Sequence, residues 1–139
     1  METPHTIAAR EAVAEDLDEV AVMLAREGIS VSKTSLVERL AGEDSGIVTT
    51  GDACASWLLD GGTLHVYDIF GYPDSLSALF DALNAVARRR LAAVLTVNVY
   101  ADDSLSPVLQ DLGFEKDWEE PDVRGGKTVL LLGLVREVA

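Results

Sequence analysis

The stretch Tyr67-Asp-Ile-Phe-Gly-Tyr-Pro-Asp-Ser-Leu-Ser-Ala-Leu-Phe-Asp-Ala-Leu83 joins two hydrophobic patterns, and this junction decides which fold the sequence predicts. It starts within the alternating run Thr63–Phe70, which is typical of a β-strand. It then becomes a helical stripe, made by Leu76, Leu79, Phe80, Leu83, Val86 and Ala87. The run Ala92–Val99 follows and is almost continuously apolar, as in a strand that is covered on both faces. A strand, a helix and a buried strand in this order predict a right-handed crossover with parallel pairing.

The hydrophobic pattern before the junction has a period of two, as in β-strands. Three strand-like runs cover Ile47–Thr50, Ala53–Leu59 and Thr63–Phe70. Gly51-Asp52 separates the first pair and Asp60-Gly-Gly62 the second, and both are turn signals. We therefore expect an antiparallel meander of three strands.

The N-terminal part predicts one strand and two helices. Residues 7–13 form a plausible first strand, and Leu17, Val20, Ala21 and Leu24 follow at the spacing of one helical face. A second helix is expected between Ser32, a candidate N-cap, and Gly42.

The C-terminal part predicts a short helix and two strands. Ser106 is a candidate N-cap with Pro107 in the first turn, and Gly113 lies past the end of the helix. Strand-like runs cover 114–119 and 128–136, separated by Pro121–Lys127 with a turn at Arg124-Gly-Gly126.

The complete order is β-α-α-β-β-β-α-β-α-β-β. This order predicts a single α/β (α+β) domain over residues 1–139, with a mixed, mostly antiparallel sheet and helices on both faces.

Composition restricts the partners of this domain. The formal net charge of −13 repels phosphates, so we expect no nucleic-acid partner and no binding to an anionic membrane. No apolar run is long enough to cross a membrane, and the N-terminus lacks the pattern of a signal peptide. Cys54 is the one cysteine, which is compatible with a reducing compartment, so we expect a cytoplasmic protein. His5 and His65 are the only histidines, and their surroundings suggest no metal site.

The element order, together with Leu112-Gly-Phe-Glu115, resembles the GNAT superfamily of acyl-CoA N-acyltransferases over essentially the whole chain. The resemblance implies an acetyl-CoA cofactor bound where the central helix begins, and an amine acceptor on a small molecule or a protein. It also implies that the cofactor contacts the end of the preceding strand, the turn and the first helical residues. These positions are Ile69, Phe70, Gly71, Ser75, Leu76 and Ser77.

Three positions depart from the family pattern. The phosphate-binding turn of the family reads, loosely, Arg/Gln-x-x-Gly-x-Gly/Ala, whereas this turn contains Gly71 alone and no basic residue occurs from Asp68 to Asn84. Asp74 or Ser75 is expected to cap the helix, and the charge of Asp74 would repel a diphosphate. An asparagine of the family is replaced by Asp102, and the tyrosine that often reprotonates the CoA thiolate is replaced by Leu109. The phosphate-binding loop is therefore degenerate.

Four other side chains are candidates for catalysis. His65 could act as a base near neutral pH, and it shares a strand face with Tyr67, opposite Leu64, Val66, Asp68 and Phe70. Tyr67 and Asp68 lie nearer to the expected acyl position, and Tyr100 could replace the missing phenol.

Three functions remain open on this basis. The first is an N-acyltransferase that moves an acyl (acetyl) group from acyl-CoA to an amine. The second is a catalytically inactive module that binds a protein or forms a homodimer, with Thr128–Val135 pairing across subunits if its edge is exposed. The third is a different small-ligand enzyme that uses the opening between the two parallel strands.

Overall fold

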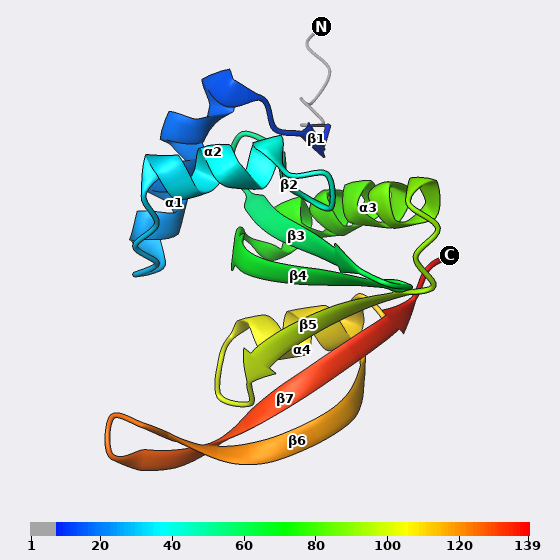
Figure 1. Ribbon diagram of the computed structural model, residues 1–139. Helices are drawn as coiled ribbons and strands as arrows, with labels where there is room; N and C mark the ends of the chain where they lie inside the picture. The colour runs from blue at the N-terminus through cyan, green and yellow to red at the C-terminus, as the bar shows by residue number, and fades with distance from the viewer. Residues whose placement is uncertain (1–7) are drawn as a thin grey trace, which may run out of the picture.

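The computed structural model describes residues 8–139, which form one twisted sheet with helices on both faces (Figure 1). The strands are β1 (Arg10–Glu11), β2 (Ser45–Thr49), β3 (Cys54–Asp60), β4 (Thr63–Phe70), β5 (Val94–Tyr100), β6 (Glu115–Arg124) and β7 (Lys127–Glu137). The helices are α1 (Leu17–Arg26), α2 (Lys33–Ala41), α3 (Pro73–Arg89) and α4 (Leu105–Asp111), with a 3-10 turn at Ala14–Asp16.

The sheet order is β1-β2-β3-β4-β5-β7-β6. All neighbours are antiparallel except β4 and β5, which are parallel and joined through α3. The predicted mixed sheet, the meander and the crossover are therefore confirmed.

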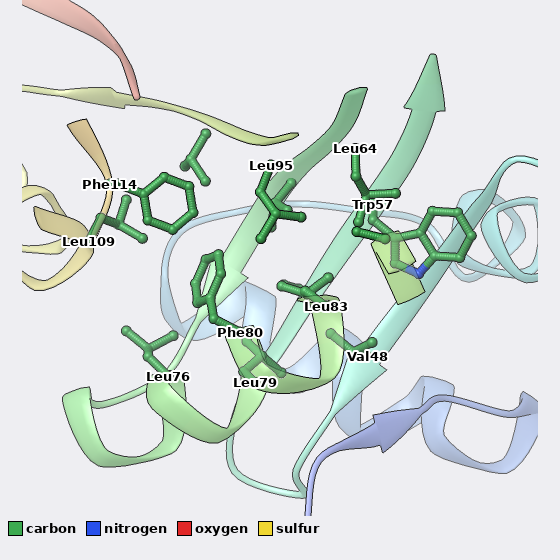
Figure 2. Packing of buried hydrophobic residues seen from close by; sticks show 14 of the residues in the cluster. Val48, Trp57, Leu64, Leu76, Leu79, Phe80, Leu83, Leu95, Leu109 and Phe114 are labelled. Carbon is green, nitrogen blue, oxygen red and sulfur yellow. The ribbon is translucent and has the colours of Figure 1, made fainter. Parts of the chain in front are cut away.

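Two hydrophobic clusters lie on opposite faces of the sheet. Adjacent residues of β2 belong to different clusters, since Ile47 packs with α1 and α2 whereas Val48 packs with α3. The larger cluster includes an edge-to-face contact between Phe80 of α3 and Phe114, whose ring centroids are 5.3 Å apart (Figure 2). Aromatic pairs prefer this geometry, which fixes α3 against the segment after α4.

The first predicted strand is much shorter in the structure. Only Arg10–Glu11 pair, with Thr49 and Val48 of β2, and Ile7 lies outside the described residues. Ala12 instead packs with the α1 and α2 cluster, and Val13 precedes the 3-10 turn.

Both predicted helix caps in the second half of the chain were wrong. α3 begins at Pro73 after Tyr72, without a side-chain cap, because proline is well suited to the first helical position. α4 begins at Leu105, whose N–H donates to Asp103 Oδ1 at 2.9 Å. Ser106 is buried within the helix and accepts a bond from Gln110.

The C-terminal hairpin is longer than predicted. β6 continues through Pro121 to Arg124, so Pro121–Lys127 is mostly strand and only Gly125-Gly126 turns. Proline is tolerated here because β6 is the edge strand. β7 pairs with β5 on one side and β6 on the other, so Thr128–Val135 offers no free edge for a second subunit.

No helix within residues 8–139 has both the length and the apolar character that a membrane crossing requires.

Candidate active site

The two parallel strands separate midway along their length. Register pairs join β4 to β5 from Thr63↔Val94 to Val66↔Val97, and none follows. Beyond this point β4 stays paired with β3 as far as Phe70, and β5 stays paired with β7 as far as Tyr100, so the two halves of the sheet separate (Figure 1). The ends of β4 and β5 therefore leave backbone groups facing an opening in the sheet.

A β-bulge lies in β4 where the strands part. Ser56 pairs with Tyr67 and Cys54 with Phe70, so two steps along β3 match three along β4. Asp68 has a φ of 51°, a left-handed conformation that is uncommon for a residue other than glycine.

The bulge overturns the predicted alternation of β4. Leu64 and Val66 pack in the cluster that contains α3, whereas Phe70 packs with α1 and α2 on the opposite face. An inserted residue reverses the side-chain faces beyond it, which the prediction of a regular strand did not include.

A cavity of about 580 Å³ occupies the opening. Its walls come from the end of α1, the second half of β4, the start of α3, the end of β5, the start of α4 and the end of β6. Its volume lies within the range of small-molecule sites, and it joins the bulge to the N-terminus of α3.

Only some of the residues predicted for the site line this cavity. Those that do are Tyr67, Asp68, Ile69, Gly71, Leu76 and Tyr100. The others lie elsewhere. His65 is exposed, with its Nδ1 2.6 Å from Thr96 Oγ1, and Phe70 is buried on the opposite face. Ser75 bonds to Asp52, and Ser77 is exposed on α3. A role for any of these residues stays a prediction.

The N-terminus of α3 presents backbone donors at the edge of the cavity. The first helical bond is donated by Leu76 N–H to Tyr72 O at 2.9 Å, so the N–H groups of Asp74 and Ser75 have no acceptor within the helix. Pro73 has no N–H. Such donors favour an anion, but the carboxylates of Asp74 and Asp52 lie at the same turn and oppose it.

Gly71 lets this turn approach β3 closely. A Cβ added at Gly71 would lie 2.7 Å from Ala53 Cβ. The turn between β4 and α3 therefore requires a glycine at this position.

Tyr100 is held by two residues of β6 that the sequence analysis missed. Its hydroxyl donates to Asp122 Oδ2 at 2.7 Å, and this hydrogen bond, followed by desolvation, raises the pKa of Tyr100. The Arg124 guanidinium lies 4.2 Å from the centre of the Tyr100 ring. Arg124 also lines the cavity, and among residues 8–139 it is the only Lys or Arg that does. Both residues lie in the segment that was predicted to be a loop. No alternating pattern there predicted a strand whose side chains reach Tyr100.

Arg39 of α2 was also missed. Its Nη2 lies 2.9 Å from Asp68 Oδ2 at the bulge, but Arg39 does not line the cavity. No local pattern in α2 indicates which strand residue a charged side chain on that helix will reach.

Two further side chains are excluded from nucleophilic or acid roles. Burial, and then the charge of Asp68, raise the pKa of Cys54 to about 12, so its thiol stays protonated. Leu109 is fully buried in the cluster that contains Phe80 and Phe114, and Figure 2 shows it beside Phe114. Within residues 8–139, no group of three His, Cys, Asp or Glu side chains is arranged to hold a metal ion.

Comparison with known proteins gives structural matches only. No family model and no curated protein matches the sequence. The solved structure of yncA from Salmonella typhimurium, assigned as an acetyltransferase and determined with its cofactor acetyl-CoA, superposes with a TM-score of 0.77 at 15% identity, covering 95% of this chain and 94% of that one.

Two further solved structures show the same likeness. The ribosomal-protein-S18-alanine N-acetyltransferase from Escherichia coli gives a TM-score of 0.75 at 16% identity and covers 95% and 94% of the two chains. Ard1 from Thermoplasma volcanium gives 0.75 at 14% identity, covering 95% and 97%. At these identities the likeness shows the architecture, and the chain has the fold of the GNAT acyltransferases.

Proposed function

We propose that this protein is a GNAT-type N-acyltransferase that moves an acetyl group from acetyl-CoA to an amine of a small molecule or a protein. The observation that carries the proposal is the cavity between the separated ends of β4 and β5, which joins the bulge to the N-terminus of α3. One structural neighbour was determined with acetyl-CoA as its cofactor, which supports a site for the same cofactor here.

The shape of the cavity and its backbone hydrogen-bond donors suit acetyl-CoA. The negative charges beside those donors do not. The N–H groups of Asp74 and Ser75 would hold the diphosphate, since neither has an acceptor within α3. Asp52 and Asp74 weaken that hold, so we expect binding that is weaker than in a protein with a basic, glycine-rich loop. When bound, acetyl-CoA supplies the activated thioester.

Residues at the other end of the cavity suit the acceptor. Glu27 lines the cavity and attracts a positively charged amine, and the strongly acidic surface has the same effect, whereas the charge of Asp68 is already paired with Arg39. Tyr100 lines the same cavity, and its phenol is protonated at neutral pH, as is usual for tyrosine. It is our candidate proton donor, in place of the absent phenol at position 109.

Titration of the protein with acetyl-CoA up to near-millimolar concentration tests the proposal. We expect heat of binding by calorimetry and a higher melting temperature, because a ligand that binds only the folded state stabilises it. Transfer of radiolabelled acetyl groups to a panel of amines and peptides then identifies the acceptor. The absence of both heat and thermal shift would contradict the proposal.

A second candidate is a catalytically inactive GNAT-fold module that binds a protein. The two carboxylates at the start of α3 favour this function, because they occupy the position where a diphosphate needs cations or bare amides. Under either proposal we place the protein in the cytoplasm, where a single reduced cysteine is stable. A homodimer stays a prediction, and Thr128–Val135 is not its interface, because β7 is paired on both sides. Light scattering measures the oligomeric state directly.

A further inference from the structure

The guanidinium of Arg39 contacts three residues of the sheet. Arg39 Nη1 donates to Ser56 Oγ of β3 at 2.7 Å, and Nη2 lies 2.9 Å from Asp68 Oδ2 of β4. The guanidinium carbon also lies 4.9 Å from the centre of the Tyr67 ring. The side chain is only 14% exposed, so these contacts are shielded from water and from salt.

These contacts converge on the bulge. Asp68 has the left-handed backbone conformation, which is uncommon for a residue other than glycine although aspartate adopts it more readily than most. Ser56 is the β3 residue at the register shift, and Tyr67 is its partner on β4. Arg39, on a helix outside the sheet, therefore contacts both strands at the bulge.

The bulge in turn shapes the cavity. Tyr67, Asp68 and Ile69 are consecutive cavity-lining residues, and they begin directly after Val66, the last residue of β4 that pairs with β5. Arg39 itself does not line the cavity, so any effect on a ligand passes through the residues it holds.

We propose that Arg39 is a positioning residue, which fixes the Tyr67–Ile69 bulge in the shape that receives the acyl end of an acyl-CoA. This inference rests on the proposed function, because it assigns the bulge end of the cavity to the acyl group and the α3 end to the diphosphate. The expected role is geometric. Arg39 holds Asp68 in its strained conformation and the ring of Tyr67 in place, and both then present a fixed wall to the thioester.

The test compares acetyl-CoA with CoA, which differ only at the acyl end. In an Arg39→Met variant we expect the affinity for acetyl-CoA to fall about tenfold or more, and the affinity for CoA to fall less than about threefold. Arg39→Lys keeps the charge but not the two-pronged geometry, so its acetyl-CoA affinity should lie between those of the wild type and Arg39→Met. Calorimetric titration of each variant measures both affinities.

Arg90→Met is the matched control. Arg90 also lies over an aromatic ring, 5.5 Å from the centre of Trp57, and it does not line the cavity. We expect it to leave both affinities unchanged. An equal loss for acetyl-CoA and CoA in Arg39→Met would indicate a general structural role, and no loss would show that the bulge does not need Arg39. Either result overturns the inference.

A second measurement separates this inference from the proposed function. Hydrogen exchange of the backbone amides needs no ligand, and in Arg39→Met it should become at least tenfold faster at Tyr67–Ile69 while Leu64–Val66 keep their rate. Wild-type protein that binds neither ligand would refute the proposed function and the acyl-end assignment. Unchanged exchange at the bulge would refute the positioning role of Arg39 by itself.

Discussion

Ser75 Oγ donates a hydrogen bond to Asp52 Oδ2 at 3.1 Å, which joins the turn between β2 and β3 to the first turn of α3. The contact places a carboxylate from a distant part of the chain at the helix end whose free amides favour an anion. The local sequence of α3 contains Asp74 at this end, but only the fold brings Asp52 beside it.

Asp52→Asn should therefore strengthen the binding of acetyl-CoA. Removing one negative charge several ångströms from a diphosphate should raise the affinity about threefold to tenfold at low salt. The gain should shrink as the ionic strength rises, because screening weakens the repulsion that was removed. Calorimetric titration at two salt concentrations measures both effects.

Asp60→Asn is the matched control for that experiment. Asp60 is an exposed acid at the end of β3, in the next turn of the meander, and it does not line the cavity. It changes the net charge of the protein by the same amount. Equal gains from the two variants would mean that net charge, and not the position of Asp52, governs the affinity.

Asp122→Asn should lower the pKa of Tyr100 toward its ordinary value. The hydrogen bond that the phenol donates to Asp122 is the main reason that the pKa is raised, because it stabilises the protonated form beside a negative charge. The ultraviolet titration of the tyrosines, with Tyr100→Phe as the reference that identifies the signal of Tyr100, measures the shift. A Tyr100 pKa that is equally high in Asp122→Asn would contradict this assignment.

The course of the chain could be read from its periodicity, whereas the site depended on what folding brings together. The stripe of α3 and the apolar run of β5 predicted the parallel pair correctly, because both patterns report burial along a single element. The bulge at Asp68 left no such pattern. A regular alternation through Phe70 would place this ring with Leu64, and the structure places it on the opposite face.

Contacts between distant segments of the chain could not be predicted from the sequence either. Arg39 and Asp68, or Tyr100 and Asp122, are pairs of ordinary polar residues whose partners are set by tertiary packing. The bond from Ser75 Oγ to Asp52 is another contact of this kind, since the two residues are far apart in the sequence. The predicted cap of α2 is confirmed, because Ser32 Oγ accepts from the N–H of Ser35. The predicted cap of α3 failed for a local reason, since Pro73 could begin this helix without any side-chain cap.

Leu109 supplies stability and cannot be converted into an acid. Its side chain is fully buried beside Phe114, so Leu109→Ala should lower the free energy of unfolding by about 2–5 kcal/mol. Leu109→Tyr should also destabilise the protein, by about 1–3 kcal/mol, because the larger ring overpacks the cluster and buries a hydroxyl. Denaturant unfolding gives both values, and a Leu109→Tyr variant that is as stable as the wild type, with faster acetyl transfer, would contradict the prediction.

Asp16 makes the N-terminal part of the fold sensitive to acid. Its carboxylate accepts two bonds of 2.7 Å from Arg10 and one of 2.7 Å from the N–H of Val13. The bonds from Arg10, and then the bond from Val13, lower the pKa of Asp16 to about 2. The charged form is therefore favoured in the folded protein more than in the unfolded chain, where an aspartate has a pKa of about 4.

The sign of the pH effect follows from these two values. The stabilisation by Asp16 is complete above about pH 4, and it is lost as the pH falls toward 2 and the folded-state carboxylate takes up a proton. Asp16→Asn should lower the melting temperature by a few degrees at pH 7, where the lost contacts contribute about 1 kcal/mol at this partly exposed position. The difference in melting temperature between variant and wild type should then decrease between pH 4 and pH 2.

Asp18→Asn is the control, because the Asp18 side chain is 83% exposed beside Lys33. A difference between Asp16→Asn and wild type that stays constant from pH 7 to pH 2 would show that Asp16 does not titrate in this way.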